Sequence, residues 1–302
     1  MAERVDRSIE AFDLLANEIR LEILRTLGEA TAKNESIPMA FSELQRRVSV
    51  DDNGRFNYHL SKLLGMFVQK TDDGYELRPQ GMRIYQAIIS GAYTDEGKVG
   101  PEQIEGEFCN DCKAAAEAWY DNSHFHLGCT ECGKLIMHYP IPPGSFENDD
   151  TSSMVEAASA WLLRYHITAK RGVCPYCAGS VEKKLSGDES QMDPLGERKY
   201  RGVVSYICRR CSWEFYCNPP FAMTLEPITI GFFADHGIDI FARHPWAIYP
   251  DAEETVLSED PWRVEIIYCV DGAELRLVID ENADVIEPPA HKQPLSDDLQ
   301  AE

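Results

Sequence analysis

Four Cys-x-x-Cys pairs constrain this chain of 302 residues more than any other feature, and they use eight of its ten cysteines. The two-residue gap lets both sulfurs of a pair converge on one ion, and two pairs supply the four thiolates of a tetrahedral zinc site. We therefore expect about two structural Zn²⁺ ions per chain. The expected ligands are Cys109, Cys112, Cys129, Cys132, Cys174, Cys177, Cys208 and Cys211.

Sequential pairing of these knuckles into two sites is the simplest arrangement, and an interleaved arrangement stays open. Four thiolates leave no free coordination position, so we do not expect catalytic zinc. Redox-active thiols are the functional alternative, which would require exposed cysteines of low pKa. Three histidines near the first site offer replacement ligands or are ordinary strand residues: His124, His126 and His138. The remaining cysteines, Cys217 and Cys269, are expected to be small buried apolar residues.

Hydrophobic periodicity predicts an α+β fold with a winged helix-turn-helix domain over residues 1–93. The first helix is expected from Arg7 to Leu27, ended by Gly28. A second is expected at Ser42–Val48, with Ser42 as its N-cap, and a third at Arg55–Leu64. Two short strands, 67–70 and 74–77, flank an Asp-Gly turn that favours a hairpin. A fourth helix is expected at 79–89, with Pro79 in its first turn.

Residues 94–107 are polar and contain glycine and proline, so we predict a linker there. A zinc-ribbon-containing α+β domain is then expected over 108–287, with a polar disordered tail at 288–302. Within it we expect a strand at 134–139, helices at 151–170 and 227–241, a strand at 213–216 and a hairpin at 263–279. Both Cys129-x-x-Cys132 and Cys208-x-x-Cys211 precede a strand, a Pro-Pro pair and a helix, which indicates a duplicated module or a chance match.

The net charge of −22 is unevenly distributed. Residues 1–93 hold 12 Lys/Arg and 14 Asp/Glu, whereas residues 94–302 hold 17 and 37. One interpretation is an acidic protein that avoids nucleic acid. The other is a nearly neutral binding domain beside an acidic one, in a composition that resembles proteins of halophilic archaea. At about 1 M salt the Debye length is only about 3 Å, so distant acidic groups would barely repel DNA.

The third predicted helix points its apolar residues Phe56, Leu60 and Leu63 inward, which leaves a polar outer face. In a winged helix this face enters the major groove, where Arg and Asn recognise base edges and Ser, Tyr and Lys suit phosphates. The expected DNA contacts are Arg46, Arg47, Arg55, Asn57, Tyr58, Ser61, Lys62 and Lys70. A smaller basic group precedes and enters the last knuckle: Lys199, Arg201, Arg209 and Arg210. It is either a nucleic-acid contact or a solvated ribbon tip.

Residues 11–88 resemble the ArsR-type winged-helix regulators, and more closely the winged-helix proteins of haloarchaea. The stretches that carry the resemblance are LLANEIRLEIL at 14–24, FSEL at 41–44 and RFNYHLSKL at 55–63. The resemblance implies double-stranded DNA as a partner and a homodimer on a palindromic site. No Cys or His cluster at sensor spacing lies in this segment, so the resemblance does not extend to metal sensing.

The sequence thus predicts a sequence-specific DNA-binding transcription regulator with structural zinc, and not an enzyme, since no nucleophile motif, phosphate loop or His/Glu metal motif is present. The alternative is a zinc-ribbon adaptor for protein or RNA whose winged helix does not read DNA. The acidic half is the expected surface for a protein partner. Without a membrane span or secretory segment, we expect no membrane partner and a cytoplasmic location.

Overall fold

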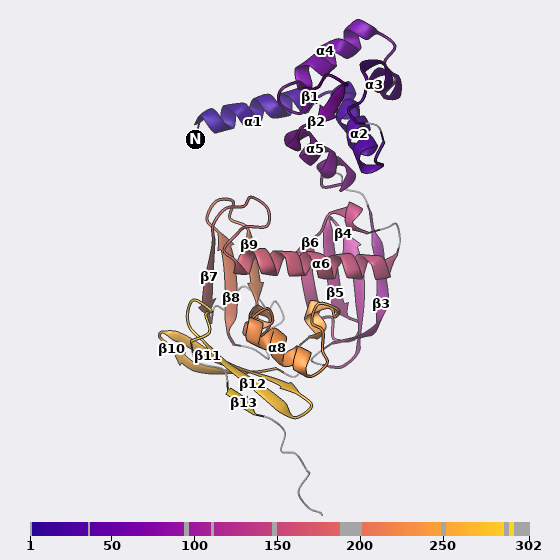
Figure 1. Cartoon of the computed structure of the whole chain (residues 1–302). Coiled ribbons are helices and arrows are strands. Elements are labelled where there is room, and N and C mark those ends of the chain that lie inside the picture. The colour runs from indigo at the N-terminus through magenta and orange to yellow at the C-terminus, as the bar shows by residue number, and fades with distance from the viewer. Residues whose placement is uncertain are drawn as a thin grey trace, which may run out of the picture. The chain divides into compact units, whose positions relative to one another are not determined.

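The computed structural model describes residues 2–35, 37–93, 97–109, 112–146, 150–187, 201–248, 252–286 and 290–292. In these residues the chain is a mixed α+β protein with eight α-helices and four small antiparallel sheets (Figure 1). It divides into two compact units. Residues 1–96 and 142–145 form the first, and residues 97–141 and 146–302 form the second. None of the described helices has the length and hydropathy needed to cross a membrane.

The first unit consists of five helices and one hairpin. In chain order they are α1 (Ala2–Leu15), α2 (Glu18–Ala32), α3 (Phe41–Val48), α4 (Asn53–Leu63), β1 (Val68–Lys70), β2 (Tyr75–Leu77) and α5 (Pro79–Ile89). The hairpin pairs Val68 with Leu77 and Lys70 with Tyr75. The three helices and the hairpin predicted between residues 42 and 89 are therefore present.

The prediction of one continuous helix from Arg7 to Leu27 is wrong, because the chain breaks at Asn17. The backbone of Asn17 is extended, and its side-chain oxygen accepts a hydrogen bond from the N–H of Arg20 as the N-cap of α2. An Asn that bonds to backbone two or three residues ahead competes with helix continuation. Gly28 does not end the helix either: it lies inside α2, where the ring of Tyr85 packs against it.

The caps of the next two helices differ in origin. Ser42 is not the N-cap of α3, because Ala40 holds that position without a side-chain hydrogen bond. Asp52 caps α4 by accepting a 2.6 Å hydrogen bond from the N–H of Arg55. The buried face of α4 is as predicted, since Phe56, Leu60 and Leu63 are 0%, 1% and 0% exposed.

The second unit contains three sheets and three helices. The first sheet is β3 (Val99–Phe108), β4 (Ala115–Asp121), β5 (His124–Cys129) and β6 (Leu135–Pro140), in that order. The second is β7 (Val181–Ser186), β8 (Val203–Cys208) and β9 (Glu214–Cys217). The third is β10 (Glu253–Glu259), β11 (Trp262–Val270), β12 (Ala273–Ile279) and β13 (Ala290–Lys292). The helices are α6 (Thr151–Lys170), α7 (Pro219–Met223) and α8 (Pro227–Asp235).

Helix α6 has the predicted bounds and crosses both the first and the second sheet (Figure 1). Tyr139 of β6 donates a hydrogen bond from its hydroxyl to the carbonyl of Ala158. Further along the helix, the ring of His166 contacts Tyr206 of β8 and Phe215 of β9. One helix therefore joins two sheets into a single core.

Three predicted boundaries are wrong in this unit. The linker predicted at 94–107 contains most of β3, which pairs with β4 at the edge of its sheet and tolerates Gly100 and Pro101 there. The helix predicted to reach residue 241 ends at Asp235, before the left-handed Gly237. The tail predicted from residue 288 includes β13, which pairs with β12. The rest of that tail lies outside the described residues.

The Gly28→Ala substitution tests the contact between α2 and α5. Alanine favours a helix interior over glycine by about 1 kcal/mol. Its Cβ would overlap the Tyr85 ring, however, and overpacking a filled site costs about 1 to 3 kcal/mol. We expect a net loss of about 1 to 2 kcal/mol in the free energy of unfolding, measured by urea denaturation of the full chain.

Gly231→Ala is the matched control, because Gly231 lies inside α8 with no heavy atom within 4 Å of a built Cβ. There the same substitution is expected to leave stability unchanged or raise it by up to about 1 kcal/mol. Equal effects of the two substitutions would contradict the packing described for Gly28.

Candidate metal centres

The eight knuckle cysteines gather into two separate groups of four. Cys109, Cys112, Cys129 and Cys132 form the first, and Cys174, Cys177, Cys208 and Cys211 form the second. Within each group all sulfur atoms lie within 4.8 Å of one another. The sequential pairing is therefore confirmed, and the interleaved arrangement is excluded. Each group can hold one metal ion.

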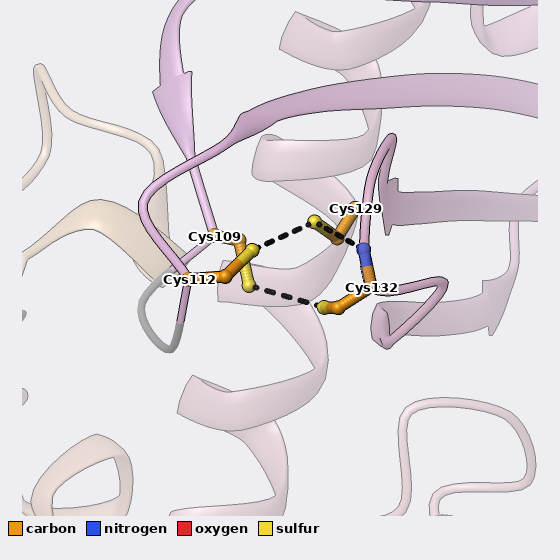
Figure 2. A group of neighbouring side chains, drawn as sticks. All are labelled: Cys109, Cys112, Cys129 and Cys132. Carbon is orange, nitrogen blue, oxygen red and sulfur yellow. Dashed lines mark hydrogen bonds between the residues drawn. The ribbon is translucent and has the colours of Figure 1, made fainter.

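In the first group two chain reversals face each other, as Figure 2 shows. Cys109 and Cys112 lie between β3 and β4, whereas Cys129 ends β5 and Cys132 lies in the turn to β6. The Sγ atoms are 3.8 Å apart for Cys109 and Cys132, and 3.3 Å apart for Cys112 and Cys129. The second group repeats this layout around β7, β8 and β9. Its sulfur distances are 3.7 Å for Cys174 and Cys211 and 3.5 Å for Cys177 and Cys208.

These separations suit a shared ion. Four sulfurs at about 2.3 Å from a tetrahedral centre would lie about 3.8 Å from one another. A disulfide would instead bring two sulfurs to about 2.05 Å, and all ten cysteines are free. In each group the first cysteine of each knuckle is buried, whereas the second is less buried or exposed. The sites therefore lie at the ends of the sheets, with their outer side toward solvent.

All four knuckles share one backbone conformation. In each, the N–H of the first cysteine bonds to the carbonyl five residues later, as from Cys109 to Ala114 and from Cys208 to Trp213. The residue after the second cysteine is left-handed in every case: Lys113, Gly133, Ala178 and Ser212. That turn reverses the chain, so the next N–H points back at the sulfur of the second cysteine. These donors are Ala114, Lys134, Gly179 and Trp213.

The sequence reveals this turn only at Gly133, because a left-handed residue is expected to be glycine and the other three are not. It also hides the role of Gly179. A Cβ there would lie 3.1 Å and 3.2 Å from the sulfurs of Cys177 and Cys208, so the second site has no room for a side chain at this position.

Backbone donors bias one thiol of each group toward the thiolate. The N–H of Cys211, together with that of Arg210, lowers the pKa of Cys208 to about 6, against the effect of burial. Burial acts to raise the pKa of Cys129, but the N–H groups of Cys132 and Glu131 outweigh it and lower that pKa to about 6. Each group thus has one ready anion at neutral pH, and a bound cation would favour loss of the other protons.

The three nearby histidines do not join the sulfur atoms. His126 stacks on Trp119 with its Nε2 atom 2.8 Å from a carboxylate oxygen of Asp121. His138 places its Nδ1 atom 3.2 Å from that of His126 and stacks on His124. The interpretation as strand residues is therefore correct, since they lie on β5 and β6 and contact one another.

One polar chain elsewhere in the second unit resembles a catalytic triad in composition. The Ser159 hydroxyl lies 2.6 Å from Nδ1 of His244, whose Nε2 atom is 3.9 Å from Glu107. Ser159, however, lies on the core side of α6 with 7% of its surface exposed. A nucleophile needs access to its substrate, so we assign this chain a role in tying α6 to the segment that follows α8.

The remaining predicted residues divide by environment. Cys217 is buried as expected, but Cys269 is exposed, so its assignment as a buried apolar residue is wrong. In the last knuckle Arg209 pairs with Glu182, and Arg210 donates to the carbonyl of Cys177. Arg201 pairs with Glu259, and Lys199 lies outside the described residues. The three described arginines thus hold the ribbon together internally.

The eight residues predicted to contact DNA all have exposed side chains: Arg46 and Arg47 on α3, Arg55, Asn57, Tyr58, Ser61 and Lys62 on α4, and Lys70 on β1. Two of them are already engaged. Glu43 bonds to both Arg46 and Arg47, and these hydrogen bonds lower its pKa to about 2. The carboxylate therefore stays charged near neutral pH and competes with any other anion for the two guanidinium groups.

A metal count tests the two groups directly. We expect elemental analysis of the full chain, purified without chelator, to give about two ions per chain. Cys112→Ser should reduce this to about one, because three thiolates and a hydroxyl bind a soft metal less tightly than four thiolates. The matched control is Cys269→Ser, which removes an exposed thiol outside both groups and should leave the count at two. A wild-type chain that carries no metal would refute the assignment.

Comparison with known families follows the division of the fold. Residues 106–285 match a family described as a domain of unknown function, DUF7351, and this span contains both four-cysteine groups and α6. Residues 8–88 match a second family with the same description, DUF7347. Neither a curated protein nor a solved structure matches the chain. Because the first match covers more than half of the chain, the protein belongs to the family DUF7351.

Proposed function

We propose that this protein is a sequence-specific DNA-binding transcription regulator whose second unit is stabilised by two structural zinc ions. The observation that carries the proposal is the division of α4 into two faces. Phe56, Leu60 and Leu63 are buried, and between them Arg55 and Asn57 face solvent. A helix with one face in the core and the other polar and exposed is the form that enters a major groove.

The order of elements supports the same function. Helices α2, α3 and α4 are followed by the hairpin β1–β2, which is the order of a winged helix-turn-helix domain. In this arrangement the last helix of the three reads base edges, and the hairpin is the wing beside it. Lys70 at the end of β1 is placed for a phosphate, with its ammonium 5.9 Å from the Tyr75 ring centre.

Within α4 the expected contacts differ in readiness. Arg55 makes no ion pair with any described residue, so its guanidinium is available to a base or phosphate. Lys62 lies 5.6 Å from the ring centre of Tyr58, and the pair forms one cationic and aromatic surface. The Ser61 hydroxyl donates to the carbonyl of Tyr58, so contact with a phosphate would require this hydroxyl to rotate.

Zinc is the metal that best fits the two cysteine groups. Four thiolate ligands in a tetrahedral set favour zinc or iron among common metals, and a closed set of four leaves no position for substrate. The ions would therefore stabilise the fold and not catalyse a reaction. We accordingly propose a regulator and not an enzyme, acting in the cytoplasm.

The regulator is proposed to act as a homodimer on a palindromic site. Helix α1 carries two large apolar side chains in solvent, Ile9 at 56% and Phe12 at 67% exposed, and these would be covered in a dimer. The acidic charge of residues 94–302 does not oppose DNA binding by the first unit at high salt, because the Debye length is then only about 3 Å.

The Arg55→Ala and Asn57→Ala substitutions test the proposed reading face. Selection of duplexes from a random pool should give wild-type protein a preferred sequence, and each variant should lose about 1 to 3 kcal/mol of discrimination against other sequences. Lys33→Ala is the matched control, since Lys33 is an exposed cation at the end of α2. If the double variant keeps full selectivity, α4 is not the reading helix. If wild-type protein selects no sequence, the adaptor function takes its place.

Releasing Arg46 and Arg47 from Glu43 tests the phosphate contacts. In Glu43→Gln the carboxylate is gone, so both guanidinium groups become available, and affinity for any duplex should rise about 3- to 10-fold. The dependence of log K on log salt should steepen by about one to two. Fluorescence anisotropy with a random-sequence duplex at several salt concentrations measures both quantities.

Glu22→Gln is the control for that release, because it frees Arg25 from an equivalent i,i+3 pair on α2. It should leave DNA affinity unchanged. If the two variants behave alike, α3 does not approach the DNA backbone.

A further inference from the structure

A pocket of about 410 Å³ lies in the second unit between the strands β6 and β9. Leu162 and Tyr165 of α6 contribute to its lining. In Figure 1 the two strands follow each other beneath α6, one from each of the sheets that this helix crosses. The pocket thus lies where the first sheet ends and the second begins.

Both strands that line the pocket are the last of their sheets. Among the described strands, β6 pairs only with β5, and β9 pairs only with β8. The outer side of an edge strand presents backbone N–H and C=O groups that no neighbouring strand satisfies. Two such edges border one pocket here, and an extended chain is the ligand that can bond to strand edges along its length.

The two faces of the pocket differ as the two faces of a strand do. Toward α6 the strands present apolar side chains. Tyr139 bonds to α6, and Phe215 contacts His166 of α6 and Phe221. Away from α6 they present His138 and Glu214, which are exposed. A guest strand with alternating apolar and polar residues would match both faces, because successive side chains point to opposite sides.

Charge defines the guest further. Glu214 accepts a hydrogen bond from the Tyr216 hydroxyl, and no described lysine or arginine forms an ion pair with it. The surrounding residues 94–302 carry 37 acidic against 17 basic side chains. A cationic segment is therefore attracted to this face, and an acidic one is repelled.

We propose that this pocket binds an extended segment of a partner protein, which adds a strand at the edges of β6 and β9. The segment carries apolar side chains at alternate positions, directed at Met137, Tyr139 and Phe215. At least one lysine or arginine lies on its other face, near Glu214. The proposal is independent of DNA binding by the first unit, and either can fail while the other stands.

The probe is a library of random twelve-residue peptides displayed on phage and selected on the full-length, metal-loaded protein. Counter-selection uses Met137→Arg, which places a charge among the apolar residues of the pocket. Enriched peptides are expected to alternate apolar and polar residues and to contain Lys or Arg. No enrichment beyond the counter-target would overturn the proposal. The metal content and unfolding temperature of the Met137→Arg variant establish that it folds.

The enriched peptide is then synthesised and titrated. Glu214→Lys should weaken its binding about 5-fold, whereas Glu281→Lys, an exposed carboxylate in the turn after β12, should not. N-methylation of two alternate backbone amides should weaken binding about 30-fold, because each removes a main-chain hydrogen bond worth about 1 kcal/mol. If the methylated peptide binds equally well, side chains alone are recognised, and strand addition is refuted.

Discussion

Four sulfur atoms held within 4.8 Å of one another cannot all ionise without a cation among them, and both ribbons of the second unit depend on this condition. The backbone provides part of the answer, because N–H groups in every knuckle point at sulfur and lower the pKa of Cys129 and Cys208. These partial charges stabilise one thiolate per group. The remaining charge requires a metal, so metal binding and folding are a single equilibrium for each ribbon.

The two ribbons are similar in detail. In each, a knuckle precedes two antiparallel strands, and a second knuckle joins these to a third strand. The third strand leads to a Pro-Pro pair, at Pro142 in the first ribbon and Pro219 in the second. The shared backbone bonds and left-handed residues of all four knuckles favour duplication over chance. The copies then diverge, since one is followed by the 20-residue α6 and the other by the shorter α7 and α8.

Sequence reasoning succeeded where local chemistry determines the outcome. Cysteine spacing gave both metal groups, Pro79 gave the start of α5, and the apolar spacing on α4 gave its buried face. It failed where tertiary pairing decides. Strand β3 lies at a sheet edge with little apolar alternation, so nothing in its composition distinguishes it from a linker. Asn17 breaks a continuous apolar stripe with one side-chain hydrogen bond, and Ala178 is left-handed only because the knuckle requires it.

The outer edges of the two ribbon sheets are closed in different ways. On β3, Gly100 and Pro101 interrupt a regular ladder, since the register shifts there and proline offers no N–H. On β7, Leu185 donates its N–H to the carbonyl of Glu281, and Lys183 pairs with Asp284, so a segment after β12 covers that side. Copies of the chain are thereby prevented from stacking edge to edge into aggregates. The protein remains soluble at high concentration even though it retains two open edges on its inner side.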